Sequence, residues 1–182
     1  MLLQTPACDF GEPAPAFTLP SPDGTLFHSA DLMGPKGLLV SFICNHCPYV
    51  IDIMPRLVGD MIKLRAAGIG LVCVMSNDYE DYPADSPERM EEFAQTYGLT
   101  CPYLVDQDQT VARAYGAVCT PDFFGFSHEN GLQYRGRLDD VPMRGDASAR
   151  APELLAAMEQ VAATGFGPEA QTPSMGCSIK WL

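Results

Sequence analysis

The spacing of apolar residues divides the chain into strands and helices. Two continuous apolar runs, residues 37–43 and 69–75, are typical of strands buried on both faces. Between them, from Val50 to Leu64, apolar residues recur at intervals of three and four, which predicts a long amphipathic helix with a kink at Pro55. The order strand, helix, strand indicates a right-handed parallel crossover.

Turn and cap residues mark the remaining elements. After a Pro-rich, extended lead-in (residues 1–16), two short apolar segments flank Ser21-Pro-Asp-Gly24 and predict an N-terminal β-hairpin. Helices are expected at 87–97, 109–115 and 152–163, a strand at 103–105, and a second hairpin from 123–126 and 132–137. Residues 165–182 are expected to form an irregular tail packed on the domain. The fold class is α/β, with a mixed central sheet and helices on both faces.

Residues 77–85 hold four carboxylates and two tyrosines. Their spacing matches no Ca²⁺ loop, so the segment is expected to be a solvated acidic loop.

Composition limits the function classes. A chain of 182 residues with 47% apolar content predicts a single domain spanning residues 1–182. The formal charge of −12 argues against nucleic-acid and membrane partners, which need basic surface. Without a signal peptide or a long apolar span, a cytoplasmic location is expected, where the seven cysteines would be thiols.

Cys44 and Cys47 stand between the first buried strand and the long helix. This is the arrangement of a redox dithiol, because the N–H groups and dipole at a helix N-terminus favour a thiolate. We expect Cys44 at the start of the helix and Cys47 one turn inside it. Two alternatives remain: half of a zinc site, although the other cysteines (8, 73, 101, 119 and 177) are scattered singly, or two structural thiols.

Further motifs accompany this dithiol in a fixed order: Phe17-Thr-Leu-Pro, residues 93–99, Val105-Asp106, Ala114-Tyr-Gly, Thr120-Pro-Asp-Phe and Gly176-Cys-Ser-Ile-Lys-Trp. With them the chain resembles the thioredoxin fold, and more closely its peroxiredoxin-like branch, related to alkyl hydroperoxide reductase and thiol-specific antioxidant proteins. It is also similar to the thiol-disulfide reductases of cytochrome maturation.

The resemblance implies a role for each site residue. Cys44 corresponds to the exposed attacking thiolate, Cys47 to the buried resolving thiol, and Pro121 to a cis-proline that faces the dithiol, with the backbone of Thr120 turned toward a substrate strand. His46 would stabilise the Cys44 thiolate, or else face solvent at a loop tip. The implied activity is thiol-disulfide exchange without a cofactor or metal. Expected partners are a disulfide-containing protein or small thiol and an electron donor such as a thioredoxin or glutathione system.

Two departures keep other functions open. Peroxiredoxins place their peroxidatic cysteine where Cys47 stands, but this chain has Cys44 and Val40 where they have Thr and Pro. The hydroxyl that orients peroxide is missing, which argues against a dedicated peroxidase. A thiol peroxidase acting through Cys47 is kept as an alternative, and a non-catalytic metal-binding module using Cys44 and Cys47 is another. Cys119 and Cys177 could each act as a third redox thiol, although packing is the simpler role for Cys119.

Overall fold

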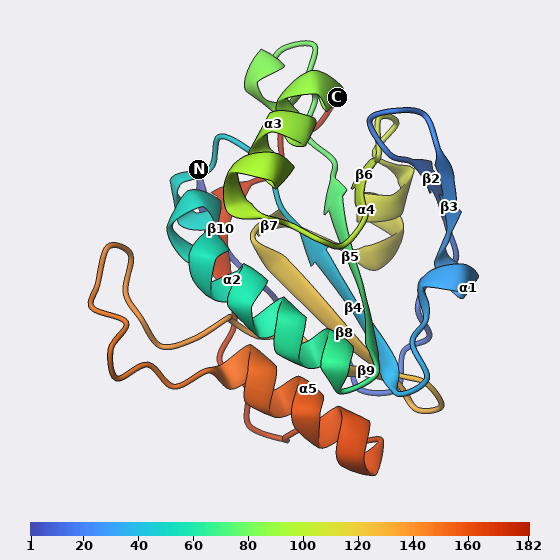
Figure 1. Cartoon of the computed structure of the whole chain (residues 1–182), viewed down its shortest axis with the longest axis vertical. Helices are drawn as coiled ribbons and strands as arrows, with labels where there is room; N and C mark the ends of the chain where they lie inside the picture. Colours follow the sequence, from blue (N-terminus) through green and yellow to red (C-terminus); the bar gives the residue numbers. More distant parts are fainter.

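A five-stranded mixed sheet forms the middle layer of the computed structural model, which describes residues 1–182 (Figure 1). Its strand order is β6 (Tyr103–Val105), β5 (Ile69–Met75), β4 (Gly37–Phe42), β8 (Asp122–Ser127) and β9 (Gly131–Tyr134). The central strand β4 runs parallel to β5 and antiparallel to β8. The predicted mixed sheet and parallel crossover are thus confirmed.

Both faces of the sheet are covered. The helices α2 (Pro48–Ala66), α3 (Pro87–Tyr97) and α5 (Glu153–Thr164) pack on one face, and α2 and α5 lie side by side in Figure 1. The other face carries α4 (Thr110–Tyr115), the hairpin of β2 (Thr18–Pro20) and β3 (Leu26–His28), and the short α1 (Ser29–Leu32). Along β4, Leu39 packs into the first layer, while Leu38 and Val40 pack into the second. This alternation explains why the strand is apolar throughout.

A second, three-stranded sheet joins the two ends of the chain. It consists of β1 (Leu2–Gln4), β10 (Met175–Ser178) and β7 (Cys119–Thr120), with β10 in the middle and antiparallel to both neighbours. The expected extended lead-in and irregular tail are therefore only partly correct, since each contains a strand. β1 has three residues and β10 has four. Each is stabilised by pairing with its neighbouring strands rather than by its own local sequence.

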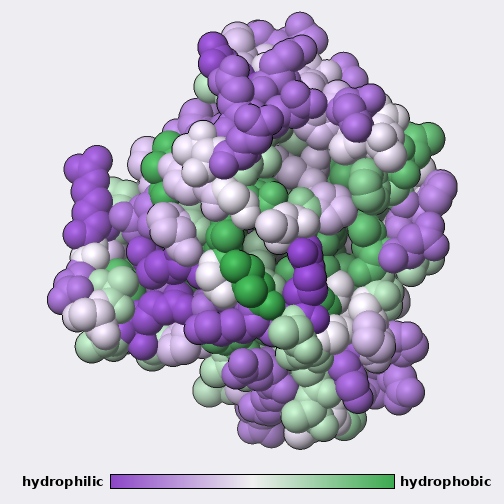
Figure 2. Space-filling view, viewed as in Figure 1, coloured by the Kyte–Doolittle hydropathy of each residue, from purple (hydrophilic) through white to green (hydrophobic).

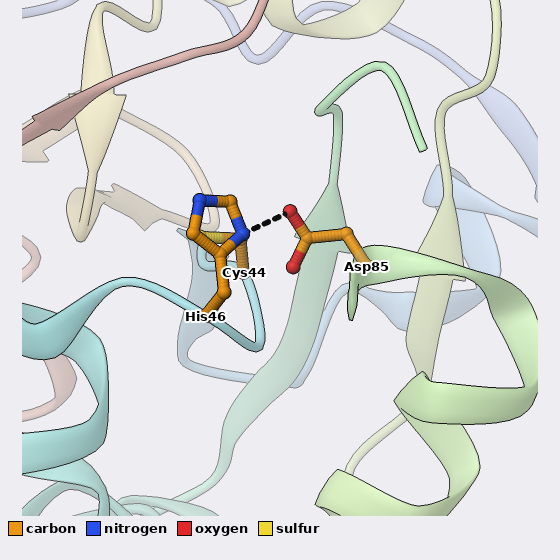
Figure 3. A group of neighbouring side chains, drawn as sticks. All are labelled: Cys44, His46 and Asp85. Carbon is orange, nitrogen blue, oxygen red and sulfur yellow. Dashed lines mark hydrogen bonds and ion pairs between the residues drawn. The ribbon is translucent and has the colours of Figure 1, made fainter. Parts of the chain in front are cut away.

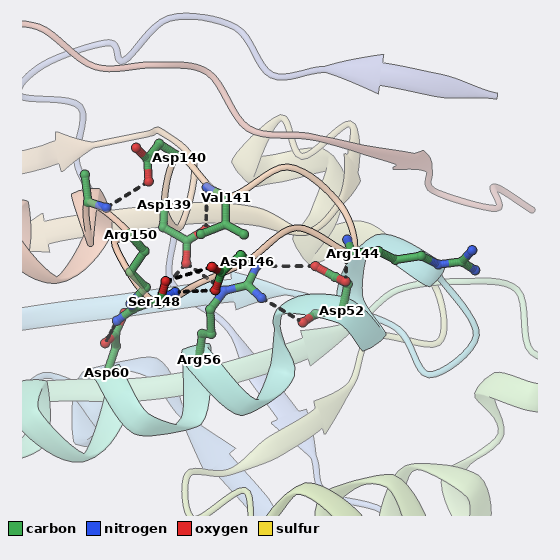
Figure 4. A network of polar contacts seen from close by, with 11 residues as sticks. Asp52, Arg56, Asp60, Asp139, Asp140, Val141, Arg144, Asp146, Ser148 and Arg150 are labelled. Carbon is green, nitrogen blue, oxygen red and sulfur yellow. Dashed lines mark hydrogen bonds and ion pairs between the residues drawn. The ribbon is translucent and has the colours of Figure 1, made fainter.

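Charged side chains hold the loop between β9 and α5 against α2 (Figure 4). Asp139 accepts hydrogen bonds from Arg56 at 2.8 Å and from Arg150 at 3.0 Å, and Arg150 also pairs with the buried Asp60. At the start of α2, Asp52 accepts the backbone N–H of Arg144 at 2.8 Å. These contacts fix a loop that has no regular secondary structure of its own.

Hydrophilic residues dominate the surface over α3 and over this loop in Figure 2, in keeping with the high negative charge. None of the helices combines the length and the apolar character needed to cross a membrane.

Candidate active site

The two cysteines lie where β4 ends and α2 begins. Cys44 follows the strand, and Cys47 is the N-cap residue of α2, with Pro48 as the first helical residue. The expectation that Cys44 starts the helix and that Cys47 lies one turn inside is therefore wrong. The cause is Pro48, which favours the first helical position and so sets the helix start one residue after Cys47.

Both sulfurs meet the same residue, Thr120. The Cys44 sulfur lies 3.3 Å from the Thr120 hydroxyl, and the Cys47 thiol donates to the Thr120 carbonyl at 3.2 Å. The Thr120–Pro121 peptide bond is cis, the form that the resemblance implied. The loop before β8 thus brings a residue about 75 positions away in sequence onto the dithiol.

Neither thiol reaches the surface. Cys44 is 1% exposed and Cys47 is 0% exposed, so the exposed attacking cysteine implied by the resemblance is not found. A cavity of about 350 Å³ is lined by Tyr49, Pro121 and Met175 among others, but by neither cysteine. A reactant must therefore reach the dithiol through a covering side chain or segment.

In the reduced pair, Cys47 is the thiol that ionises more readily and carries the negative charge. A hydrogen bond from Cys44 lowers the pKa of Cys47 to about 4, helped by the Cys177 thiol and by the backbone N–H of Val50 in the first turn of α2. Burial opposes this shift. The same hydrogen bond, burial and the Asp85 carboxylate raise the pKa of Cys44 well above its ordinary value. The argument that a helix N-terminus favours the thiolate holds, but it applies to Cys47 and not to Cys44.

His46 is held by a buried carboxylate. Its Nδ1 lies 2.7 Å from Asp85 Oδ2 (Figure 3), and its ring stacks on Tyr82 at 5.8 Å between ring centres. The hydrogen bond with Asp85 raises the pKa of His46. The side chain is 29% exposed, and a ring nitrogen lies within 4.8 Å of the Cys44 sulfur, so the alternative of a free, solvent-facing histidine does not describe it.

Asp85 is a site residue that the sequence did not reveal. It lies at the end of a 3-10 turn, Pro83–Asp85, and is fully buried, so the expected solvated acidic loop is wrong at this position. Its carboxylate accepts the backbone N–H of Asn45 at 2.8 Å and the side-chain amide of Asn77 at 2.8 Å, besides bonding His46. Asn45 and His46 lie about 40 residues away in sequence, so the local composition of the loop could not show that the charge is compensated.

Cys119 and Cys177 differ in their relation to the pair. The Cys119 thiol donates to the Pro121 carbonyl at 3.6 Å instead of to either sulfur, and burial raises its pKa to about 12. Cys177, on β10, is partly buried, lies opposite Thr120 in the strand register and helps to lower the pKa of Cys47. The backbone edge of Thr120, which the resemblance left open for a substrate strand, is paired with β10 instead.

Three potential metal ligands also gather here. The ligand atoms of Cys44, His46 and Asp85 lie within 4.8 Å of one another and are of types that zinc accepts. Cys47, the second ligand of the expected metal-binding module, is not in this group. His46 and Asp85 are hydrogen-bonded to each other, so a metal would have to replace that bond.

Comparison with known proteins places this site in a family. The sequence model described as the AhpC/TSA family matches residues 10–138, which include the dithiol and Pro121. The chain belongs to the AhpC/TSA family. Peroxiredoxin Bcp of Escherichia coli is 25% identical over 119 residues, covering 65% of this chain and 71% of that protein. The AhpC/TSA chain is thus a thioredoxin-like redox protein and an oxidoreductase.

Solved structures agree on the fold. An uncharacterized conserved protein from Geobacillus kaustophilus is 38% identical, with a TM-score of 0.93 over 100% of this chain and 97% of that one. A secreted disulfide oxidoreductase of Mycobacterium tuberculosis superposes with a TM-score of 0.59 over 81% of this AhpC/TSA chain and 95% of its own, at 19% identity. The predicted thioredoxin-like fold is confirmed.

Proposed function

We propose that this protein is a thiol-disulfide oxidoreductase whose redox pair is Cys44 and Cys47. The observation that carries the proposal is the convergence of both sulfurs on Thr120, next to a charge-stabilising helix N-terminus. Oxidation of the pair forms the Cys44–Cys47 disulfide and reduces one substrate disulfide to two thiols. The pair gives up two electrons and the Cys44 proton, and solvent supplies the second proton because Cys47 reacts as the thiolate. A disulfide-containing protein or small thiol would be the substrate, with a thioredoxin or glutathione system as electron donor.

The charge distribution revises the roles within the pair. In the proposed reaction Cys47 is the thiolate and Cys44 the second thiol, the reverse of the roles that the resemblance implied. The supporting contacts are the Cys44 and Cys177 thiols and the Val50 N–H, all of which stabilise negative charge on Cys47. His46, paired with Asp85, adds a positive charge beside Cys44 when it is protonated.

The test is disulfide mapping combined with turnover. Reduced protein treated with glutathione disulfide should contain the Cys44–Cys47 disulfide, identified by mass spectrometry of its peptides. Turnover of glutathione disulfide should fall to background in both Cys44→Ser and Cys47→Ser. The control variant Cys8→Ser should keep the wild-type rate. Absence of the Cys44–Cys47 disulfide, or turnover by either serine variant at the wild-type rate, would overturn the proposal.

A thiol peroxidase reaction through Cys47 is the second candidate, favoured by its lowered pKa and by the family. Cys47 would attack the peroxide oxygen, giving a sulfenic acid and releasing water or an alcohol. Cys44 would then displace water from that sulfur, so the same disulfide results. Single-turnover peroxide consumption by reduced protein tests this reaction, and consumption no faster than by Cys47→Ser would exclude it.

The metal-binding alternative is tested separately. Protein purified without oxygen should carry less than one equivalent of zinc if the dithiol is a redox pair. A full equivalent that is lost in His46→Gln would instead favour the group formed by Cys44, His46 and Asp85.

A further inference from the structure

The C-terminal strand occupies the edge at which a substrate strand was expected. β10 pairs antiparallel with β7, and its register sets Cys177 opposite Thr120 and Ser178 opposite Cys119. Its other edge pairs with β1, where Cys177 lies opposite Leu2. The protein's own chain thus supplies a cysteine at the position that faces the dithiol across the cis-proline loop.

The direction of the Cys177 side chain follows from this register. Residues directly opposite each other in an antiparallel pair project to the same face of the sheet. The Thr120 hydroxyl contacts the Cys44 sulfur at 3.3 Å, so that face is the face of the dithiol. Cys177 therefore projects toward the pair, and its thiol and backbone N–H contribute to the lowered pKa of Cys47.

Exposure separates Cys177 from the buried pair. Cys44 and Cys47 are at most 1% exposed, whereas Cys177 is only partly buried. Of the three neighbouring thiols, Cys177 is the one that reaches solvent. Both Cys44 and Cys177 contribute to the lowered pKa of Cys47.

The strand that carries Cys177 is firmly placed. A Cβ atom at Gly176 would stand 2.0 Å from the Thr120 carbonyl oxygen, so glycine allows the two backbones to approach this closely. Beyond β10, the backbone N–H of Lys180 donates to Asn77 at 2.9 Å, and that of Leu182 donates to Gln109 at 2.8 Å. Contacts on both sides of Cys177 thus hold its thiol at the dithiol.

We propose that Cys177 is a third redox thiol, which forms a disulfide with Cys47 and carries electrons between the buried Cys44–Cys47 pair and disulfides in solution. This inference rests on the proposed function. It adds an entry point for the substrate and a second disulfide within the protein.

Three exchange steps connect the substrate to the pair. Burial and the neighbouring Cys47 raise the pKa of Cys177 to about 11, so Cys47 must act as the base that takes the Cys177 proton when Cys177 attacks the substrate disulfide. The attack forms a mixed disulfide and releases the first substrate thiol, to which Cys47 passes that proton. Cys47 then attacks the Cys177 sulfur and releases the second substrate thiol. Finally Cys44 attacks Cys47, which forms the Cys44–Cys47 disulfide and returns Cys177 as a thiol. Each step breaks one S–S bond and forms one. The Cys177 proton goes to the first substrate thiol and is replaced by the Cys44 proton in the last step, and solvent supplies the proton of the second substrate thiol, because Cys47 attacks as the thiolate.

The first test isolates the internal disulfide. In Cys44→Ser the last step cannot occur, so treatment with glutathione disulfide should accumulate a Cys47–Cys177 disulfide, detected by mass spectrometry of the linked peptides. The control is Cys44→Ser combined with Cys8→Ser, because Cys8 is the other partly buried cysteine, and it should give the same linked peptides. Glutathione attached to Cys47 without any Cys47–Cys177 linkage would overturn the proposal.

The second test measures the relay in turnover. Cys177→Ser should reduce the rate with glutathione disulfide by about tenfold or more, because Cys47 is then reached only when β10 moves aside. Gly176→Ala should lower the rate although Cys177 is retained, since the added Cβ displaces β10 from Thr120. Wild-type turnover by Cys177→Ser while Cys44→Ser and Cys47→Ser are inactive would remove the relay and leave the proposed function intact. Full activity of all three serine variants would remove the proposed function itself.

Discussion

Two pairs of neighbouring thiols lie in this protein, and only their surroundings distinguish them. Cys44 and Cys47 meet at the end of β4, while Cys73, within β5, and Cys101 lie in the core with their sulfurs 3.6 Å apart. All four are buried. Closeness and burial alone therefore do not mark a redox site.

The difference lies in what surrounds each pair. Around Cys47 are the N-terminus of a helix and neighbouring thiols, and they lower its pKa to about 4. Around Cys73 and Cys101 are apolar side chains, with the Met61 sulfur 4.0 Å from Cys101, and the pKa of Cys73 is raised well above its ordinary value by the hydrogen bond with Cys101 and by burial. Since the thiolate is the reacting form, the core pair should be inert and the pair at the helix reactive.

The largest contrast is expected in activity. Cys47→Ser removes the thiolate and should reduce turnover of glutathione disulfide to background, whereas Cys101→Ala should stay within about twofold of wild type because it touches no reacting group. Steady-state assays of the two variants at equal folded concentration measure this. Comparable losses in both variants would mean that the core pair takes part in the chemistry.

The next contrast is in ionisation. The reduced protein should hold one thiolate at neutral pH, visible by its ultraviolet absorbance, and lose it as the pH falls through about 4. Cys47→Ser should lack this signal at neutral pH, while Cys73→Ser should retain it. A signal that disappears in Cys44→Ser but persists in Cys47→Ser would return the charge to Cys44.

The sequence predicted the parts of the fold that depend on local patterns. The apolar run of β5 and the Ser86-Pro87 start and Gly98 end of α3 match the structure at residues 69–75 and 87–97. The dithiol and the proline loop were also identified, because strand, Cys-x-x-Cys and helix are adjacent in sequence. β1 and β10 were missed because a strand of three or four residues gains its stability from its neighbours.

The electrostatics of the site could not be predicted from the sequence. The local composition predicts that Asp85 is one of several solvated carboxylates. Its role in the site depends on hydrogen bonds with Asn45, His46 and Asn77, of which Asn45 and His46 are distant in sequence. The relation of Cys177 to Cys47 likewise depends on the register of β10 with β7, which no local pattern encodes. The thiolate is favoured on Cys47 chiefly by the hydrogen bond from Cys44, with help from Cys177 and from the Val50 N–H in the first turn of α2.

Substitutions in the core pair should lower the stability more than substitutions in the reactive pair, which is the opposite of their effects on activity. Cys73→Ser places a hydroxyl group among apolar side chains and should lower the free energy of unfolding by roughly 1–3 kcal/mol. Cys44→Ser should cost less, because the Thr120 hydroxyl, 3.3 Å from the sulfur, can pair with the new oxygen. Urea unfolding of the reduced proteins compares them, with Cys73→Ala as the control that removes the sulfur without adding a polar group. An equal cost for both serine variants would show that the two sites are equally apolar.

The smallest effect concerns the ion pair between His46 and Asp85, which belongs to the reactive site and has no counterpart at the core pair. Asp85 raises the pKa of His46 in the folded protein above the ordinary 6.5, so the protonated imidazole stabilises the fold. This contribution is complete below pH 6.5 and is lost as the pH rises through the folded-state pKa.

His46→Gln should therefore lower the free energy of unfolding by about 1 kcal/mol or less at low pH, with the difference from wild type shrinking as the pH rises. His28→Gln is the matched control, because His28 contacts the Thr18 hydroxyl instead of a carboxylate. A His46→Gln deficit that grows with pH would mean that His46 stabilises the protein in its neutral form, and the ion pair with Asp85 would then have no part in holding the Cys44 side of the site.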